Sequence, residues 1–84
     1  MDTQITIQLL AFGIARDVLG QRQTDWVLPA PATVDDLRAD LEKHFPLLTG
    51  LASLAIAINS EYARKGQALA DGDEVALIPP VSGG

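Results

Sequence analysis

Residues 33–45 read TVDDLRADLEKHF, which is the best helix candidate in the chain. The apolar residues recur at intervals of three and four positions and form one stripe: Val34, Leu37, Leu41 and Phe45. Thr33 can cap the first free N–H groups, and two aspartates favour the positive end of the helix dipole. Pro46 ends the helix close to Phe45. Because one face of this helix must be covered, we expect it to pack on a sheet.

The segments around this helix have the patterns of strands. Alternating apolar and polar residues, or short apolar runs between turn signals, predict strands over four segments: 5–9, 24–28, 54–59 and 74–78. A short edge strand is expected at 62–64, and 71–73 (DGD) is a strong turn signal. Between the first two strands, residues 12–19 predict a short helix, with Gly20 as its left-handed C-terminal cap.

The order of these elements favours one architecture. All apolar faces share a single core if the main helix crosses one face of a mixed sheet of four or five strands. The sequence therefore predicts an α+β domain of β-grasp type. We expect residues 1–78 to form this domain and residues 79–84 to form an extended C-terminal tail.

Composition and charge exclude several classes of function. The 84 residues carry a net charge of −5 and have no clustered Lys and Arg, so nucleic-acid binding is not expected. The absence of cysteine removes thiol nucleophiles, disulfides and thiolate metal sites. No signal peptide or membrane-spanning segment is recognisable. These features predict a cytoplasmic domain that binds neither nucleic acid nor membrane.

The last seven residues, 78–84, read IPPVSGG and predict a functional tail. Extended at about 3.3 Å per residue, positions 79–84 reach about 20 Å, which is enough to enter the active site of another protein. The two prolines restrict φ and lower the entropy lost when the tail is ordered. Gly83 and Gly84 have no side chain, so a narrow channel can admit them and the terminal carbonyl carbon is open to attack.

The terminal carboxylate is ionised at neutral pH and is a poor electrophile. Converting it to an adenylate with ATP would supply a good leaving group. A sulfur nucleophile could then form a thiocarboxylate, which carries sulfur without any cysteine. The alternative is that the Gly-Gly end is a frayed terminus with no function.

Four segments together resemble a known family: LLAFGIARDVLG at 9–20, TVDDL at 33–37, AIN at 57–59 and DGDEVALIPPVSGG at 71–84. In order and spacing they are similar to the small subunits of molybdopterin synthase, which are ubiquitin-like sulfur carriers. The resemblance covers nearly the whole chain. The segment at 71–84 is its most specific part, and the segment at 9–20 is a second, independent match.

The resemblance implies a role for the tail. An adenylyltransferase of the ubiquitin-activating type would activate Gly84, and a sulfur-donor enzyme would convert it to the thiocarboxylate. The large subunit of the synthase would accept the tail and transfer sulfur to a cyclic pyranopterin phosphate. The chain would thus be no enzyme on its own, because the family's catalytic residues lie on the large subunit. It would bind no cofactor, and ATP would be used by the activating enzyme.

The resemblance also implies a surface that docks both partners. Phe12, Tyr62 and Ile78 occupy the family's apolar docking positions. Strand alternation places Ile78 on the face of Ala76, away from Leu77, which makes exposure plausible. An exposed apolar cluster usually marks an interface. The alternative is that Phe12 and Tyr62 are ordinary core or edge residues. The family usually carries larger aromatic residues where Leu77 and Ile78 stand, which leaves the contact details open.

The remaining partner-binding candidates are Arg16 and the residues of the tail before Gly83. Arg16 could pair with an acidic group of a partner, or it could be a solvated helix charge. The tail residues would line the partner's channel: Pro79, Pro80, Val81 and Ser82.

Metal and hydrolase sites are not expected. His44 has no second histidine and no cysteine to complete a metal site. The acidic residues at 71–74 lack the other ligands of a calcium loop, so they predict a charged turn. No serine motif accompanies His44.

Three other functions stay open. The chain could carry sulfur for thiamine or cysteine synthesis instead. It could be a ubiquitin-like protein modifier, whose Gly84 forms an isopeptide bond with lysines of target proteins. It could also be an interaction module with an inert tail.

Overall fold

The computed structural model describes residues 3–50 and 54–79. Its strands are β1 (Gln4–Ala11), β2 (Gln23–Pro29), β3 (Ala32–Thr33), β4 (Ala55–Ile58), β5 (Glu61–Tyr62), β6 (Ala68–Leu69) and β7 (Glu74–Ile78). Its helices are α1 (Gly13–Leu19), α2 (Val34–His44) and the 3-10 helix η1 (Pro46–Gly50).

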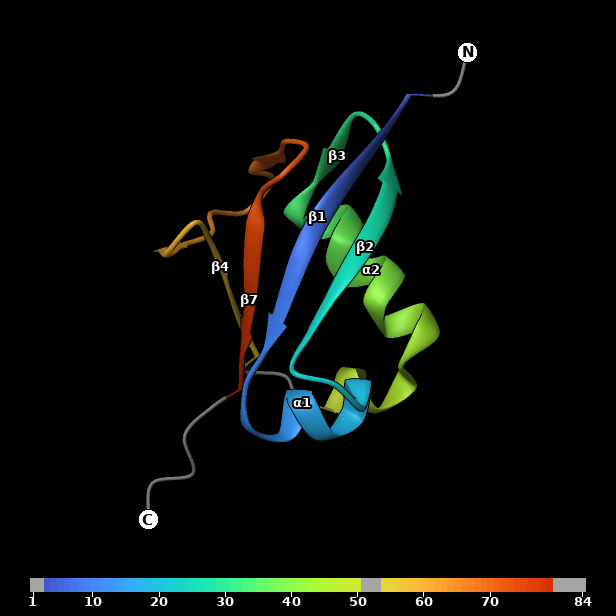
Figure 1. The fold of residues 1–84 in the computed structure, drawn as a ribbon, viewed down its shortest axis with the longest axis vertical. Helices are drawn as coiled ribbons and strands as arrows, with labels where there is room; N and C mark the ends of the chain where they lie inside the picture. The colour runs from blue at the N-terminus through green and yellow to red at the C-terminus, as the bar shows by residue number, and fades with distance from the viewer. Residues whose placement is uncertain (1–2, 51–53, 80–84) are drawn as a thin grey trace.

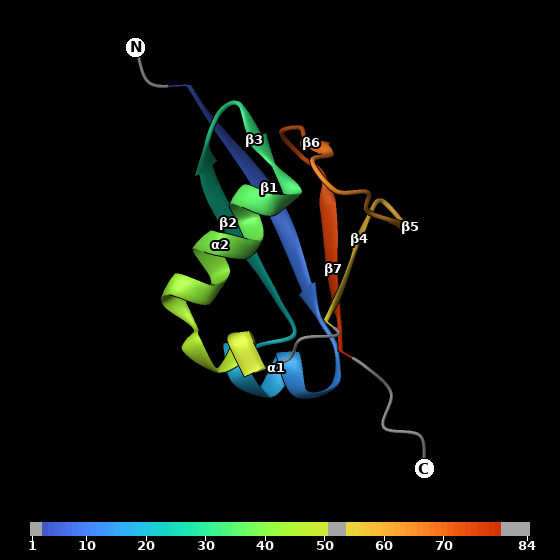
Figure 2. The same ribbon diagram turned by 180° about the vertical axis from the view of Figure 1, so that it is seen from behind.

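The main sheet has five strands in the order β2-β1-β7-β4-β5, so β7 lies in its middle. β1 pairs with β2 in antiparallel and with β7 in parallel orientation, and β4 pairs with β7 and β5 in antiparallel orientation. In Figure 1 the sheet lies in front of α2, and Figure 2 shows α2 from its own side. The mixed sheet with one main helix across one face confirms the predicted α+β class and β-grasp arrangement.

α2 begins as the sequence predicts, with Thr33 as its N-cap. The Thr33 hydroxyl accepts a hydrogen bond from the Asp36 N–H at 3.2 Å, and the Asp36 carboxylate accepts one from the Thr33 N–H at 2.9 Å. This reciprocal capping box satisfies two free donors of the first turn. The apolar stripe is confirmed, because Val34, Leu37 and Leu41 are buried and Phe45 packs against the core.

The core lies between α2 and the two central strands. Six of its larger side chains are less than 2% exposed: Ile7, Leu9, Leu37, Leu41, Val75 and Leu77. Burial of a Val, Leu or Ile side chain contributes about 1.5–3 kcal/mol, so these side chains of α2, β1 and β7 are a large part of what stabilises the fold. Within residues 3–48 and 54–79, no polar or charged side chain is buried. No helix of this described part is long and apolar enough to cross a bilayer.

The edge strand expected at 62–64 is displaced, because β5 is Glu61–Tyr62. The Arg64 N–H donates to the Gln67 side chain at 2.9 Å, and the Gln67 N–H donates to the Arg64 carbonyl at 3.0 Å. These bonds make Arg64 the first residue of a turn and not the end of a strand. The small sheet of β3 and β6, together with η1, was not predicted from the sequence.

The turn before β7 is held by its acidic side chains, as the charged-turn interpretation requires. Asp71 accepts a hydrogen bond from the Thr6 N–H at 2.7 Å, and Asp73 accepts from the Ala70 N–H at 2.8 Å. Asp73 also accepts from the Asn59 side chain at 3.0 Å, and Asn59 in turn accepts from the Glu74 N–H at 2.9 Å. The start of β7 is thereby fixed to β1 and to the turn after β4.

Candidate docking surface at the end of the C-terminal strand

β7 carries the chain to the base of the predicted tail, and its two sides differ. Val75 and Leu77 are fully buried, whereas Ala76 and Ile78 are half-buried on the opposite face. The prediction that Ile78 shares a face with Ala76 is therefore confirmed. The tail residues Pro80, Val81, Ser82, Gly83 and Gly84 lie outside the described part of the chain.

A depression of about 290 Å³ lies on the face of the sheet that turns away from α2. We call it the outer depression, and its lining residues are Leu10, Phe12, Ala57, Ser60, Tyr62, Glu74, Ala76 and Ile78. Phe12 is 50% exposed and Tyr62 is 73% exposed. The structure thus brings the predicted contact residues Phe12, Tyr62 and Ile78 to one surface, although they come from distant parts of the chain. Phe12 and Tyr62 are therefore not core residues, although Tyr62 lies on the edge strand β5, as the alternative of an edge residue allows.

Phe12 is held at this surface by the start of α1. Its N–H donates to the carbonyl of Leu77 at 3.3 Å, and its own carbonyl accepts from Ala15 at 3.1 Å. Ala15 and Leu19 are buried on the inner side of α1, whereas Phe12 and Ile14 are exposed. Both views show α1 at the end of the sheet where β7 ends (Figures 1 and 2).

Tyr62 is held by a tight hairpin between β4 and β5. Asn59 and Ser60 have φ values of 50° and 73°, and a two-residue turn with both central φ values positive matches the twist of the flanking strands. The register pairs Ala57 with Tyr62, so both side chains lie on the outer face. The small Ala57 beside the large Tyr62 leaves part of the depression open.

Polar groups form only a small part of the outer depression. Glu74 and Ser60 are its two polar lining residues. Arg16 is exposed on the last turn of α1 and does not line the depression. Within the described part of the chain, Arg16 forms no ion pair. A largely apolar floor with a single carboxylate is typical of a protein-binding surface.

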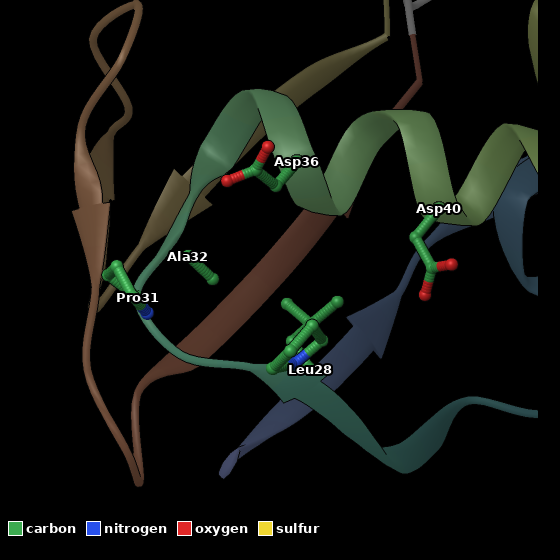
Figure 3. A pocket seen from close by; sticks show the side chains of 6 residues that line it. Leu28, Pro31, Ala32, Asp36 and Asp40 are labelled. Atoms are coloured by element: carbon green, nitrogen blue, oxygen red, sulfur yellow. The ribbon is translucent and has the colours of Figure 1, made fainter. Parts of the chain in front are cut away.

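A second cavity, also of about 290 Å³, lies between α2 and the loop after β2 (Figure 3). Its two carboxylates, Asp36 and Asp40, project from α2. Asp36 caps the helix, and Asp40 accepts a hydrogen bond from the indole N–H of Trp26 at 2.9 Å. Both groups therefore have structural partners, and none of the predicted site residues lies here. His44 packs edge-on against Trp26, and its Nδ1 lies 2.9 Å from the Asp40 carbonyl oxygen.

Comparison with known proteins agrees with this geometry. The model of the ThiS family matches residues 9–84. The molybdopterin synthase sulfur carrier subunit of Chlamydomonas reinhardtii is 40% identical over 81 residues, which cover 93% of this chain and 98% of that protein. The corresponding subunit of Phaeosphaeria nodorum is 40% identical, with 90% and 88% covered. Small archaeal modifier protein 3 of Haloferax volcanii is 30% identical, with 93% and 98% covered.

Solved structures give the same result. SAMP1 from Haloferax volcanii superposes with a TM-score of 0.80 at 32% identity, covering 94% of this chain and 99% of that chain. A chain in the complex of subunits 1 and 2 of the molybdopterin-converting factor from Helicobacter pylori superposes with a TM-score of 0.66 at 28% identity, covering 95% and 100%. These likenesses confirm the resemblance and the ubiquitin-like fold predicted from the sequence. The chain belongs to the ThiS family.

Proposed function

We propose that this chain is the sulfur carrier subunit of a molybdopterin synthase and that Gly84 is its donor group. The observation that carries the proposal is the likeness to molybdopterin synthase sulfur carrier subunits along 93% of the chain. The outer depression adds a physical argument, because it offers exposed apolar side chains next to the strand from which the tail departs.

The chemistry proposed for Gly84 has two stages. Its carboxylate oxygen attacks the α-phosphorus of ATP on the activating enzyme, and pyrophosphate leaves. A sulfide equivalent from a sulfur-donor enzyme then attacks the carbonyl carbon of the acyl adenylate and expels AMP. The product is a thiocarboxylate. ATP makes this exchange possible, because AMP is a good leaving group and the oxygen of a free carboxylate is a poor one. This chain binds no cofactor in the scheme.

Sulfur transfer is proposed to occur in the large subunit, whose residues supply the catalysis. The tail, from Pro79 through Ser82 to Gly83, would pass through a channel of that subunit and deliver the thiocarboxylate to a cyclic pyranopterin phosphate. The sulfur attacks a carbon of the substrate and displaces an oxygen leaving group, which gives a thioester to Gly84. Water then cleaves the acyl–sulfur bond, so the sulfur stays on the product and the carboxylate of Gly84 is restored. Because a dithiolene holds two sulfur atoms, two charged carriers are used for each product.

The outer depression is the proposed docking surface for both the activating enzyme and the large subunit. Phe12, Tyr62 and Ile78 would supply the apolar contacts, and aromatic side chains contribute strongly at such interfaces. Arg16 lies outside the depression and would pair with an acidic group at the edge of the interface. The Helicobacter pylori complex of two subunits supports an assembly of this kind.

Intact-mass spectrometry tests the proposal. The chain is incubated with ATP, sulfide and the activating enzyme encoded beside it or in the same genome. We expect a mass increase of one sulfur-for-oxygen exchange at Gly84, and an unchanged mass would contradict the proposal. The charged chain is then mixed with the large subunit and the pyranopterin substrate, and formation of molybdopterin identifies the pathway.

A second candidate function is protein modification. It is favoured by the likeness to small archaeal modifier proteins in sequence and in structure. In that case the activated Gly84 would be attacked by the ε-amino group of a target lysine, and AMP would leave. Mass spectrometry of tryptic peptides from cells would detect lysines that carry the C-terminal residues of this chain. Lysine conjugates without molybdopterin formation would favour the modifier. A role in thiamine or cysteine synthesis would be tested by replacing the large subunit with the sulfur-accepting enzyme of that pathway.

A further inference from the structure

The first residue of α1 touches the last described residue of the chain. Gly13 has a φ of +54°, and a Cβ built on it would lie 3.1 Å from Cγ of Pro79. That separation is shorter than nine in ten real Cβ contacts, so the pyrrolidine ring packs against the bare Cα of Gly13. Pro79 is half-buried at this position.

The backbone beside this contact is fixed on both sides. Phe12, next to Gly13, donates its N–H to the carbonyl of Leu77 at 3.3 Å. In the parallel ladder of β1 and β7, Ala11 is the register partner of Leu77. The turn from β1 into α1 is therefore anchored to the end of β7 directly before Pro79. The ring of Pro79 therefore contacts a backbone segment that these bonds already hold in place.

Two properties restrict position 13 to glycine. A positive φ is a conformation that residues with a Cβ adopt only with strain. In addition, any Cβ would push against the ring of Pro79. Gly20 has the first property alone, because its φ is +80° and a Cβ there would meet nothing within 4 Å. The chain thus contains its own matched control for backbone strain.

We infer that Gly13 is a positioning residue, which sets the direction in which the chain leaves the sheet by giving the ring of Pro79 a flat contact. The inference rests on the proposed function, in which the residues after Pro79 carry the reactive terminus. Ile78 lines the outer depression and Pro79 contacts Gly13. The residue proposed to bind the partner and the residue that orients the tail are therefore adjacent in the chain. A partner that binds the depression then receives the tail from a defined angle.

A double-mutant cycle between Gly13→Ala and Pro79→Ala tests the inference. The readout is single-turnover sulfur transfer from the thiocarboxylated chain in complex with the large subunit. We expect Gly13→Ala to slow transfer by about tenfold, since small misplacements of a reacting group have effects of this size or larger. Affinity for the large subunit should stay unchanged. In the Pro79→Ala background, where Cγ is absent, we expect the same Gly13→Ala change to slow transfer by no more than about twofold.

Gly20→Ala is the matched control. It should lower the melting temperature as Gly13→Ala does and leave transfer unchanged. If Gly20→Ala slows transfer equally, or if Gly13→Ala acts equally in both backgrounds, the inference is wrong.

NMR separates this inference from the proposed function. We expect a nuclear Overhauser contact between the Hα protons of Gly13 and the Hγ protons of Pro79 in the wild-type chain. Absence of that contact overturns the inference and leaves the sulfur-carrier proposal standing. Failure of the wild-type chain to accept sulfur overturns the proposed function, although the NMR contact would still be seen.

Discussion

The two faces of the central sheet have the same backbone and opposite surroundings. On the inner face, Leu77 is fully buried against α2 and the neighbouring strands. On the outer face, the adjacent Ile78 lines a depression that no helix covers in the described part of the chain. One strand thus stabilises the fold through alternate residues and places the others on an exposed surface. Substitutions on the two faces should therefore have separable effects on stability and on binding.

The largest effect is expected where neither face is changed. Removal of Gly84, or addition of one residue after it, should abolish sulfur transfer, because the reactive carbonyl is lost or displaced. The melting temperature should stay the same, since the buried core ends with β7. Thiocarboxylate formation by mass spectrometry and a circular-dichroism melt provide the two measurements. Activity that survives the deletion would contradict the proposal that Gly84 is the donor group.

The next prediction compares neighbours on β7. Leu77→Ala should lower the free energy of unfolding by about 2–5 kcal/mol, because it leaves a cavity in the core. Ile78→Ala, on the half-buried outer face, should cost about 1 kcal/mol in stability and weaken binding to the large subunit. Urea titration and calorimetric binding measure the two effects. Equal losses of stability would show that the two faces are not distinct.

Tyr62→Ala should affect binding alone. Its side chain is 73% exposed on β5, so its removal leaves no cavity in the core. We expect binding to the large subunit to weaken by at least about tenfold, which corresponds to about 1.4 kcal/mol. Val27→Ala is the control, since Val27 is likewise an exposed apolar side chain, at 51%, but does not line the outer depression. An equal loss of affinity for both variants would argue against a docking role of the depression.

The smallest effect on sulfur transfer is expected at the start of β7. Asp73→Ala removes the acceptor for the Ala70 N–H and for the Asn59 side chain. We expect a loss of about 1–2 kcal/mol in stability and unchanged sulfur transfer at a temperature where the variant is folded. A transfer defect in the folded variant would show that the whole of β7, and not only its end, orients the tail.

The sequence predicted those elements whose signals are local. The apolar stripe of α2, the cap at Thr33 and the left-handed Gly20 depend on residues within one or two turns, and all three were confirmed. Alternation along β7 likewise placed Ile78 on the outer face. The shared location of Phe12, Tyr62 and Ile78 came from the family resemblance, because no local pattern relates residues so far apart.

The features that were missed depend on tertiary contacts. β3 and β6 pair over two residues each, which is too short for any periodicity. The end of β5 is set by the hydrogen bond from the Arg64 N–H to the side chain of Gln67. Gly13 gave no signal of its own, because its importance depends on Pro79 at the other end of the sequence. A glycine at the first position of a short helix was the one available hint.

The position of the last strand in the middle of the sheet has a consequence for biosynthesis. β7 separates β1 from β4 and bonds to both, so neither can complete its pairing before residues 74–78 have left the ribosome. Chains that terminate before β7 would expose unpaired strand edges, which make nascent chains prone to aggregation. The five-stranded sheet therefore cannot close until the chain has been synthesised through Ile78.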